Sequence, residues 1–408
     1  MVTAAQAPAA IFLLLLFGLT AVRPLLDVML LEIQDMESIP QEDDDSMVTV
    51  SLIDFTPCFE WILAYPINTS TRYEERKRLG EGFFGKAKLV VPHCTNICPK
   101  PNLVLKEAKV WANSESYRAA IREEYFGKIF RRIPKIVPGS KNLARMVETI
   151  RGSNEFYTVS MFEGITLHSA LYKSSKPGNE PYQWWKWLKK TPEGNTAMRD
   201  IMKQMISGLA LLHRYNITHR DLKPDNIVIC FYTPWGDCIG KPTIELAYHG
   251  LHLRLIDFGS GLDEYSQAHL YGRFGPTTGT QDDNYMSPEC FYRADCLTTS
   301  KANLAKYDMF TVGQIFMEMI LRTQDVFGYE DDLFGKKRFL DMCVEGVKLA
   351  LPPHCNSEKS FLKYIRERDP LKIGFPGIRG LRFAQQLLHH DIDKRLSAEK
   401  ALRHPYLN

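Results

Sequence analysis

The sequence has few of the features that mark a secreted protein or a fibrous one. Nine cysteines in 408 residues are too few and too unevenly spaced for a small disulfide scaffold, and we expect mostly reduced, buried thiols. A zinc site at His93, Cys94 and Cys98 is disfavoured, because no second Cys-x-x-Cys pair follows at zinc spacing. The 26 glycines and 23 prolines show no triplet period, which excludes collagen-like and low-complexity classes.

The chain also lacks a strong charge of either sign. Fifty-one basic residues against 48 acidic ones leave a net charge of +3, which is too little to indicate a nucleic-acid partner. Apolar residues make up 45% of the chain and charged residues 24%, close to the globular average, so a sizeable core is available. The length predicts about two to three domains, or one large two-lobed unit.

No charged residue occurs in the first 22 positions. The apolar run from Ala9 to Val22 is shorter than the roughly 20 residues that cross a bilayer, although residues 1–22 together reach that length. A secretory signal would begin with basic residues, and here only Arg23 flanks the run. The sequence favours a membrane anchor at residues 1–26, with the rest of the chain facing the cytoplasm. The alternatives are a cleaved signal or transit segment, a truncated gene start, or a buried helix in a soluble cytoplasmic protein.

The composition then changes along the chain. Residues 27–50 are predicted to be an acidic linker, because Asp27 to Asp45 holds eight acidic residues and no basic one. Residues 51–72 form an N-terminal extension. Residues 73–164 alternate short strand-like runs with one helix, and residues 165–408 are mainly helical.

Individual elements can be placed within these regions. Strands are expected at Lys86–Val91, Asn102–Trp111, Leu143–Ile150 and Phe156–Phe162, and a helix at Ser114–Ile133 with Ser114 as its N-cap. Apolar residues spaced by three and four predict a second helix whose stripe packs in the core. The stripe consists of Met198, Ile201, Met202, Met205, Ile206, Leu209 and Leu212.

Three glycines in the order G-x-G-x-x-G follow the first strand. Gly80, Gly82 and Gly85 would let backbone N–H groups approach phosphate oxygens. A dinucleotide-binding turn shares this pattern but opens a helix. Because strands flank these glycines on both sides, we expect a hairpin that covers phosphates.

A lysine and an acid fit an ion pair behind this hairpin. Lys106 lies on the expected third strand, and Glu123 or Glu124 on the following helix could hold it. Glu123 shares a helix face with apolar residues that include Phe126 and Phe130, so we prefer it to Glu124.

The densest chemical motif is HRDLKPDN at His219 to Asn226, and Asp257-Phe258-Gly259 follows it. Two acids and an amide at these positions suit phosphoryl transfer: Asp221 could accept or orient a hydroxyl proton, while Asn226 and Asp257 ligate Mg²⁺. With this motif the chain resembles the eukaryotic protein kinase superfamily, of Ser/Thr type, over about residues 73–407.

The resemblance implies an α+β, bilobal protein-kinase fold, with a small β-rich N-lobe at 73–164 and a larger, mainly helical C-lobe at 165–408. It implies ATP and Mg²⁺ as cofactors, and protein substrates. The residues that match catalytic positions are Asp221, Lys223, Lys106 and Glu123. Those that match nucleotide-binding positions are Gly80, Glu81, Gly82, Phe83, Gly85, Ala87, Val104, Lys106, Val159 and Val228. Asn226 and Asp257 match the metal ligands.

Further positions resemble structural parts of the family. Glu289 of Ser287-Pro288-Glu289 would pair with Arg395. His219, Arg220 and Asp221 resemble the start of the family's catalytic loop, which Asp308 would support. Arg220 implies that phosphate–arginine pairing orders the segment from Asp257 to Glu289. Thr277 and Thr278 are the candidate phosphorylation sites, or plain loop threonines, and Thr280 matches a threonine that contacts the catalytic aspartate.

The sequence departs from the family pattern at several points. Ala87 and Val104 exchange the usual sizes of two adenine contacts, which predicts that ATP binds in a shifted position. Gly127 replaces a large apolar residue on the first helix, so the placement of that helix is expected to depend on a partner. An insertion at residues 174–195 carries Trp184, Trp185 and Trp187, which either contact a partner or membrane or anchor a loop.

These patterns predict an ATP-dependent protein kinase that phosphorylates Ser or Thr. The alternative is a pseudokinase, a nucleotide-binding scaffold of the same fold. The complete set of phosphate and metal residues favours the enzyme, and the departures favour the scaffold.

Overall fold

The computed structural model describes residues 72–81, 85–93, 101–108, 114–152, 155–172, 180–232, 238–239, 250–273, 275–276, 282–287, 289–290, 301–327 and 358–408. The predicted anchor at 1–26, the acidic linker at 27–50 and nearly all of the extension at 51–72 lie outside these ranges. So do Gly82, Phe83, Cys94, Cys98, Thr277, Thr278, Thr280 and Pro288. Within the described ranges, no helix is long and apolar enough to cross a membrane.

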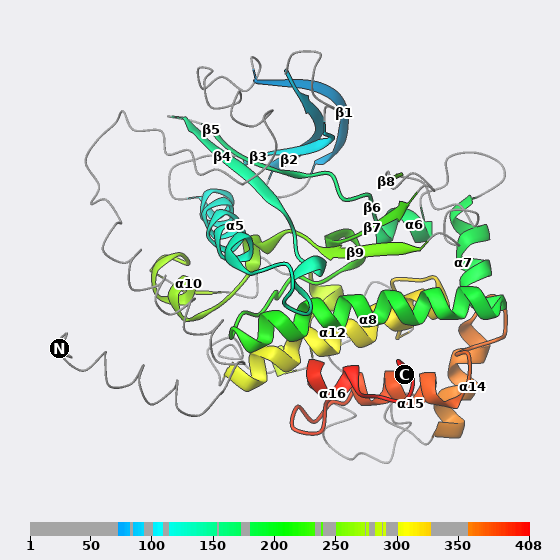
Figure 1. Ribbon diagram of the computed structural model, residues 1–408. Helices are drawn as coiled ribbons and strands as arrows, with labels where there is room; N and C mark the ends of the chain where they lie inside the picture. Colours follow the sequence, from blue (N-terminus) through cyan, green and yellow to red (C-terminus); the bar gives the residue numbers. More distant parts are fainter. Residues whose placement is uncertain are drawn as a thin grey trace, which may run out of the picture. The chain divides into compact units, whose positions relative to one another are not determined.

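The first part of the described chain is an antiparallel five-stranded sheet (Figure 1). Its strands are β1 (Tyr73–Glu81), β2 (Gly85–Pro92), β3 (Leu103–Ala108), β4 (Met146–Gly152) and β5 (Glu155–Met161), in the order β1-β2-β3-β5-β4. The expected strands are confirmed within the described residues, except that β4 begins three residues later than Leu143. Residues 109–111 of the strand predicted at Asn102–Trp111 lie outside these ranges. One face of the sheet has its own core, which includes Leu103, Leu105 and Val159.

Helix α5 (Glu115–Arg132) packs beside this sheet (Figure 1). It begins where the sequence predicts, because the Ser114 side chain accepts a hydrogen bond from the Tyr117 N–H at 3.2 Å. This bond satisfies one of the N–H groups that lack a partner in the first turn of a helix. Two arginines close the last turn, where positive charge favours the helix dipole. Glu123 is thereby carried on a helix with fixed ends.

The second part contains a smaller antiparallel sheet and most of the helices. Strand β7 (Ile227–Tyr232) pairs with β6 (Ile165–Thr166), β8 (Cys238–Ile239) and β9 (Leu251–Leu255). The helices are α6 (Leu167–Tyr172), α7 (Glu180–Lys190), α8 (Pro192–Arg214), α10 (Glu264–His269), α12 (Lys301–Leu321), α14 (Glu358–Arg368), α15 (Ile378–Leu387) and α16 (Ala398–Leu402). This arrangement confirms the predicted α+β fold.

The main core lies among these helices. The predicted stripe from Met198 to Leu212 lies on α8 and is buried in the core cluster. Helix α8 runs alongside α12 (Figure 1), and α12 contributes a nearly continuous buried segment from Tyr307 to Leu321. Burial of apolar side chains at about 25 cal/mol per Å² is the main stabilising contribution here.

The tryptophans of the insertion belong to this core. Trp184, Trp185 and Trp187 lie on α7 and are 0%, 0% and 6% exposed. The Trp185 indole N–H donates to the Met319 carbonyl at 2.7 Å. The tryptophans anchor the insertion in the core as predicted, but on a helix and not on a loop. A tryptophan surface for a partner or membrane is wrong, because these side chains are not accessible.

The prediction of reduced cysteines needs a correction. Cys230 on β7 and Cys238 on β8 form a disulfide, and Cys290 is also disulfide-bonded. Cys230 and Cys238 are eight residues apart in sequence, but the β7–β8 pairing brings them onto adjacent strands. The sparse spacing of the cysteines gave no indication of this pairing.

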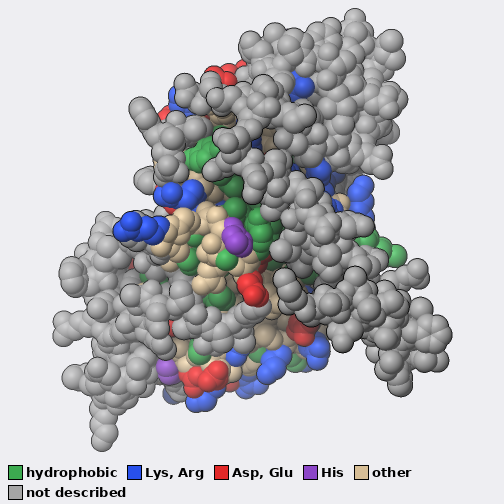
Figure 2. Space-filling view, turned by 90° about the vertical axis from the view of Figure 1, so that its left-hand side faces the viewer, with side chains coloured by type: hydrophobic (Ala, Val, Ile, Leu, Met, Phe, Trp, Pro, Cys, Tyr) green, Lys and Arg blue, Asp and Glu red, His purple; other side chains and the backbone are tan. Residues whose placement is uncertain are grey.

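Charged side chains of both signs are interspersed on the surface. Figure 2 shows lysine, arginine, aspartate and glutamate side chains mixed among the described residues of one face. This mixture agrees with the nearly equal numbers of basic and acidic residues, 51 and 48.

Candidate active site

Lys106 bridges two acids that come from different parts of the chain. Its ammonium Nζ lies 2.8 Å from Glu123 Oε2 on α5 and 2.8 Å from Asp257 Oδ1 after β9. The preference for Glu123 over Glu124 is confirmed. Glu124 is buried elsewhere, where it accepts a hydrogen bond from Thr149 at 2.9 Å and pairs with Arg151.

The burial of this cluster sets the protonation of its members. Burial alone would lower the pKa of Lys106, but the charges of Asp257 and Glu123 outweigh it and raise the pKa. Burial also raises the pKa of Glu123. At Asp257 burial is outweighed by the charge of Lys106, which lowers the pKa of that carboxyl. Lys106 therefore stays protonated and Asp257 stays ionised.

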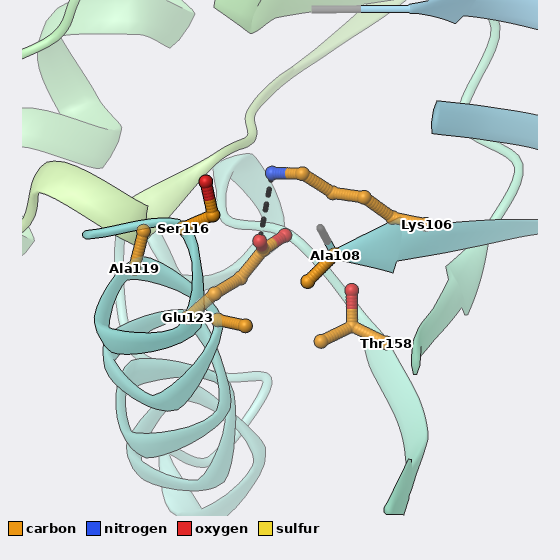
Figure 3. Close-up of a pocket in the computed structure, with 7 residues that line it drawn as sticks. Lys106, Ala108, Ser116, Ala119, Glu123 and Thr158 are labelled. Atoms are coloured by element: carbon orange, nitrogen blue, oxygen red, sulfur yellow. Dashed lines mark hydrogen bonds and ion pairs between the residues drawn. The ribbon is translucent and has the colours of Figure 1, made fainter. Parts of the chain in front are cut away.

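A small pocket lies beside this pair (Figure 3). Figure 3 shows Lys106 reaching from β3 and Glu123 rising from α5 to meet it, with Thr158 on the neighbouring strand. The rest of the lining consists of small side chains, Ala108, Ser116, Ala119 and Ala120. Small residues leave room around the ion pair.

The catalytic loop gathers the second group of predicted residues. Lys223 Nζ lies 3.1 and 3.0 Å from the two oxygens of the Asp221 carboxylate. The Asn226 amide donates to the same carboxylate at 2.9 Å and to the Asp221 carbonyl at 2.7 Å. Burial raises the pKa of Asp221, although Lys223 acts against the shift, and the charge of Asp257 adds to the rise. Asp257 is thus close enough to affect the ionisation of Asp221.

Asp308 on α12 holds the catalytic loop from the protein interior. Its carboxylate accepts hydrogen bonds from the backbone N–H groups of His219 and Arg220, both at 2.9 Å. His213 Nε2 lies 3.0 Å from the same carboxylate. Because Asp308 is fully buried, these bonds form in a low dielectric and restrain the loop strongly. The support predicted for Asp308 is what the structure shows.

Two of the predicted residues have unusual backbone conformations. Arg220 has a φ of 68° and Asp257 a φ of 62°. Non-glycine residues rarely adopt this left-handed region, and such strain persists where the surrounding structure over-determines it, often at functional sites. Here the two strained residues belong to the catalytic loop and to the motif that carries the second acid.

The glycine hairpin is confirmed by the pairing of β1 with β2. Gly85 opens β2, and a Cβ added there would lie 1.8 Å from the Glu107 carbonyl oxygen of β3. The strands approach so closely that only glycine fits. Gly80 is different, because a Cβ there would meet nothing within 4 Å. Glu81 at the end of β1 pairs with Arg78.

Strand register shows on which face of the sheet the predicted nucleotide contacts lie. Paired residues on antiparallel strands share a face. Ala87 and Thr158 pair with Lys106 and so lie on its face.

Val104 lies on the same face as Lys106, two residues before it, and pairs with Ser160. Val159 pairs with Leu105, and both side chains belong to the core on the other face. The assignment of Val159 as a nucleotide contact is therefore wrong for its side chain.

Ser160 and Thr158 lie on the face of Lys106 but were not among the nucleotide contacts predicted from the sequence. The signal that could have found them is the period of two along β5, which puts residues 158 and 160 on one face and residue 159 on the other. In the second sheet, Val228 pairs with Thr166 and Arg254. Its neighbours Ile227 and Ile229 lie in the main core, so Val228 is on the other face, as expected of a nucleotide contact.

The space above Gly127 is filled from within the chain. A Cβ at Gly127 would lie 2.5 Å from Met146 Cε and 2.6 Å from its Sδ. Met146 begins β4, and its flexible side chain fills irregular gaps well. The sequence led us to expect that a partner places α5. In the structure Met146 packs there and the Lys106–Glu123 pair is formed, while dependence on a partner stays a prediction.

A further predicted ion pair joins Glu289 and Arg395. Arg395 donates to both oxygens of the Glu289 carboxylate at 2.8 Å, in the bidentate geometry that makes such pairs strong. Arg395 also donates to the Lys306 carbonyl at 2.8 Å. These bonds tie the end of the segment that follows Asp257 to the C-terminal helices.

The donor set suits a magnesium ion that is shared with phosphates. Among the described residues, no group of three His, Cys, Asp or Glu side chains is placed to hold a metal. The candidate ligands are the Asp257 carboxylate and the Asn226 amide oxygen. Mg²⁺ commonly takes one or two protein oxygens and completes its shell with waters and substrate phosphates. The residues present fit such an ion.

Comparison with known proteins agrees with this geometry. The sequence model of the family described as protein kinase domain matches residues 73–407. The chain belongs to the eukaryotic protein kinase superfamily. The residues described above therefore lie within a kinase domain.

Curated relatives of this kinase domain differ in what their names say. A protein of Arabidopsis thaliana named "probable inactive protein kinase" is 31% identical over 71% of this chain and 96% of its own length. The serine/threonine-protein kinase ICK of Mus musculus is 25% identical over 65% of this chain and 36% of its own. The extracellular signal-regulated kinase 7 of Drosophila melanogaster is 25% identical over 82% and 32%.

Proposed function

We propose that the chain is an active protein kinase that transfers the γ-phosphoryl group of Mg-ATP to Ser or Thr hydroxyls of proteins. The carrying observation is the Lys106 ammonium, which lies 2.8 Å from both Glu123 and Asp257. This bridge brings the lysine that would hold phosphate to the carboxylate that would hold metal. Phosphoryl transfer depends mainly on such positioning and on electrostatic stabilisation.

Each residue then has a role in this proposal. Asp221 would orient the substrate hydroxyl and accept its proton. Lys223 and Asn226 donate hydrogen bonds to its carboxylate and so hold it in position. Lys106 and Lys223 would neutralise phosphate charge. Asn226 and Asp257 would hold the Mg²⁺, which supplies charge neutralisation at the phosphates.

A scaffold function is the second candidate. It is favoured by the name of the Arabidopsis thaliana relative and by the exchanged sizes of Ala87 and Val104. In that case nucleotide would bind beside Lys106 without phosphoryl transfer. The intact arrangement of Asp221, Lys223 and Asn226 supports the enzyme, because a scaffold does not need it.

The decisive experiment measures ³²P incorporation from labelled ATP by the full-length chain and by its Asp221→Asn form. Asparagine keeps the size of the side chain but cannot accept the proton, so we expect incorporation to fall by about 100-fold or more. Equal incorporation by both forms, or none by either, would refute the enzyme proposal. Nucleotide binding without incorporation would support the scaffold.

The Ser/Thr preference has its own test. It is supported by Lys223, because a lysine two residues after Asp221 resembles the pattern of Ser/Thr kinases. A degenerate peptide library with a fixed Ser, Thr or Tyr acceptor would show label in the Ser and Thr pools. Preferential labelling of the Tyr pool would contradict the preference.

The membrane location stays a prediction from the apolar run at residues 1–26. Fractionation of cells that express the full chain, beside a chain that lacks residues 1–26, tests it. We expect the full chain in the membrane pellet and the shortened chain in the supernatant. Recovery of the full chain in the supernatant would refute the predicted membrane anchor.

A further inference from the structure

Tyr271 lies where three elements of the site meet. It lies two residues after the end of α10 and is buried, with 5% of its surface exposed. Its hydroxyl lies 2.7 Å from the carbonyl oxygens of both Ser260 and Gly261, to which its proton donates. These carbonyls follow Asp257 by three and four residues, so the tyrosine is bonded to the backbone that carries the proposed metal ligand.

An arginine from α5 packs on the ring of this tyrosine. The guanidinium carbon of Arg122 lies 3.9 Å from the ring centroid, a favourable cation–π distance. Arg122 also donates to the Gly259 carbonyl at 2.6 Å and to the Leu270 carbonyl at 3.1 Å. Because Arg122 precedes Glu123, these contacts fix the turn of α5 that supplies the partner of Lys106.

An arginine from the catalytic loop bonds to the hydroxyl. Arg220 Nη1 donates to the Tyr271 oxygen at 2.8 Å and to the Ser260 carbonyl at 3.3 Å. Arg220 is 1% exposed, and a buried charge is stable only when hydrogen-bond acceptors such as these surround it. Since Arg220 precedes Asp221, the bond restrains the residue that would accept the substrate proton.

The flanking segment is held in the same place by other contacts. Asp263 caps α10 by accepting from the Ser266 N–H at 2.7 Å, and it also accepts from the Tyr125 hydroxyl of α5 at 2.9 Å. The ring of Tyr265 stacks on that of Tyr125, with centroids 5.0 Å apart. Helix α10 thus packs against α5, and this packing places Tyr271 next to Arg122 and Arg220.

We infer that Tyr271 is a positioning residue that holds α5, the catalytic loop and the segment after Asp257 together without phosphorylation. The sequence suggested that phosphate would pair with Arg220, and in the structure the Nη1 of that guanidinium donates to the Tyr271 hydroxyl. A phenol is a weaker acceptor than a phosphate, yet it is present in every copy of the chain. The inference rests on the proposed function for its catalytic consequence, whereas the positioning itself can be measured separately.

Hydrogen–deuterium exchange of the full-length chain tests the positioning. The chain is treated with phosphatase, and peptides that cover residues 257–262 are compared in wild type and Tyr271→Phe. Phenylalanine keeps the ring on Arg122 but removes the hydroxyl. We expect local opening to increase about tenfold in the variant, as the loss of a hydrogen bond to a charged group predicts, and phosphatase to leave the wild type unchanged.

Tyr265→Phe is the matched control, because it removes a hydroxyl from the same segment and keeps the stacked ring. Peptides from α8, residues 198–212, report whether each variant is folded. If Tyr271→Phe does not fold, Arg122→Lys keeps the charge but alters the guanidinium contacts with the Tyr271 ring and with the Gly259 and Leu270 carbonyls, and should open the same peptides. Wild-type exchange in Tyr271→Phe, or opening of the wild type by phosphatase alone, would overturn the inference.

Binding of the fluorescent analogue mant-ATP gives a second readout that general destabilisation would not produce. Tyr271→Phe should weaken binding about tenfold in the presence of Mg²⁺ and little in its absence, since Asp257 acts through the metal. Equal weakening under both conditions would contradict the positioning role. Failure of the wild type to transfer phosphate would refute the kinase proposal and would leave the exchange result valid.

Discussion

The ammonium of Lys106 lies 2.8 Å from the carboxylate of Asp257, although 151 residues separate them in the sequence. The same ammonium contacts Glu123 on α5. A single cation thus joins the five-stranded sheet, a helix and the segment after β9. Removal of this cation would leave two carboxylates facing each other, which gives the first prediction.

Lys106→Met should weaken nucleotide binding by at least about tenfold, because a phosphate partner is lost and the carboxylates of Glu123 and Asp257 repel the incoming charge. The free energy of unfolding should fall by about 1–3 kcal/mol, as expected when buried charged groups lose their partner. Mant-ATP titration and urea denaturation measure the two effects. Lys88→Met, which removes a lysine of β2 that pairs with Glu75, is the control and should change neither by much.

Gly85→Ala should destabilise the sheet by about 1–3 kcal/mol, because the new methyl group would lie 1.8 Å from the Glu107 oxygen and force β2 and β3 apart. Gly80→Ala is the matched control, since its Cβ meets nothing within 4 Å. It should change stability by less than about 0.5 kcal/mol. Thermal denaturation of both variants provides the measurement. Equal melting temperatures would show that the close approach of the strands is not real.

Substitutions on the two faces of β5 should affect different properties, stability on one face and nucleotide affinity on the other. Val159→Ala should cost about 2 kcal/mol of stability through the cavity it leaves in the core, with nucleotide affinity unchanged. Ser160→Leu should reduce nucleotide affinity about tenfold or more by filling the face that Lys106 and Val104 share, with little loss of stability. Mant-ATP titration and urea denaturation of both variants separate the effects. Weaker binding by Val159→Ala alone would restore the original assignment.

The buried carboxyl of Glu318 on α12 predicts a pH dependence of stability. Burial raises its pKa to about 7, against the hydrogen bonds from the Tyr285 and Tyr172 hydroxyls, which are 2.6 and 2.9 Å long. The folded protein therefore holds a proton that the unfolded chain releases near pH 4.5.

The contribution of Glu318 to the free energy of unfolding is present below pH 4.5 and is lost as the pH rises to about 7. The loss is up to about 1.4 kcal/mol per pH unit. Glu318→Gln removes the titration and keeps a hydrogen-bond acceptor for the tyrosines. The difference in melting temperature between wild type and variant should shift in favour of the variant as the pH is raised from 5 to 8. A constant difference would contradict the raised pKa.

Much of the fold and site could be predicted because the relevant signals are local. The spacing of Met198 to Leu212 identified α8, and Ser114 identified the start of α5, since helix periodicity and capping involve residues within one or two turns. The G-x-G-x-x-G, HRDLKPDN and Asp257-Phe258-Gly259 motifs indicated phosphoryl-transfer chemistry for the same reason. The orientation of Glu123 followed from the apolar residues on its helix face.

Tertiary structure decided what depends on partners far away in the sequence. The Cys230–Cys238 disulfide and the face of Val159 depend on which strands pair and in which register. The filling of the Gly127 space by Met146 and the contacts of Arg220 with Tyr271 depend on packing between elements. In such cases residue identity limits the possible chemistry, but the neighbour that completes it is set only when the folded chain brings the two together, because contact energies depend on distance and not on sequence order.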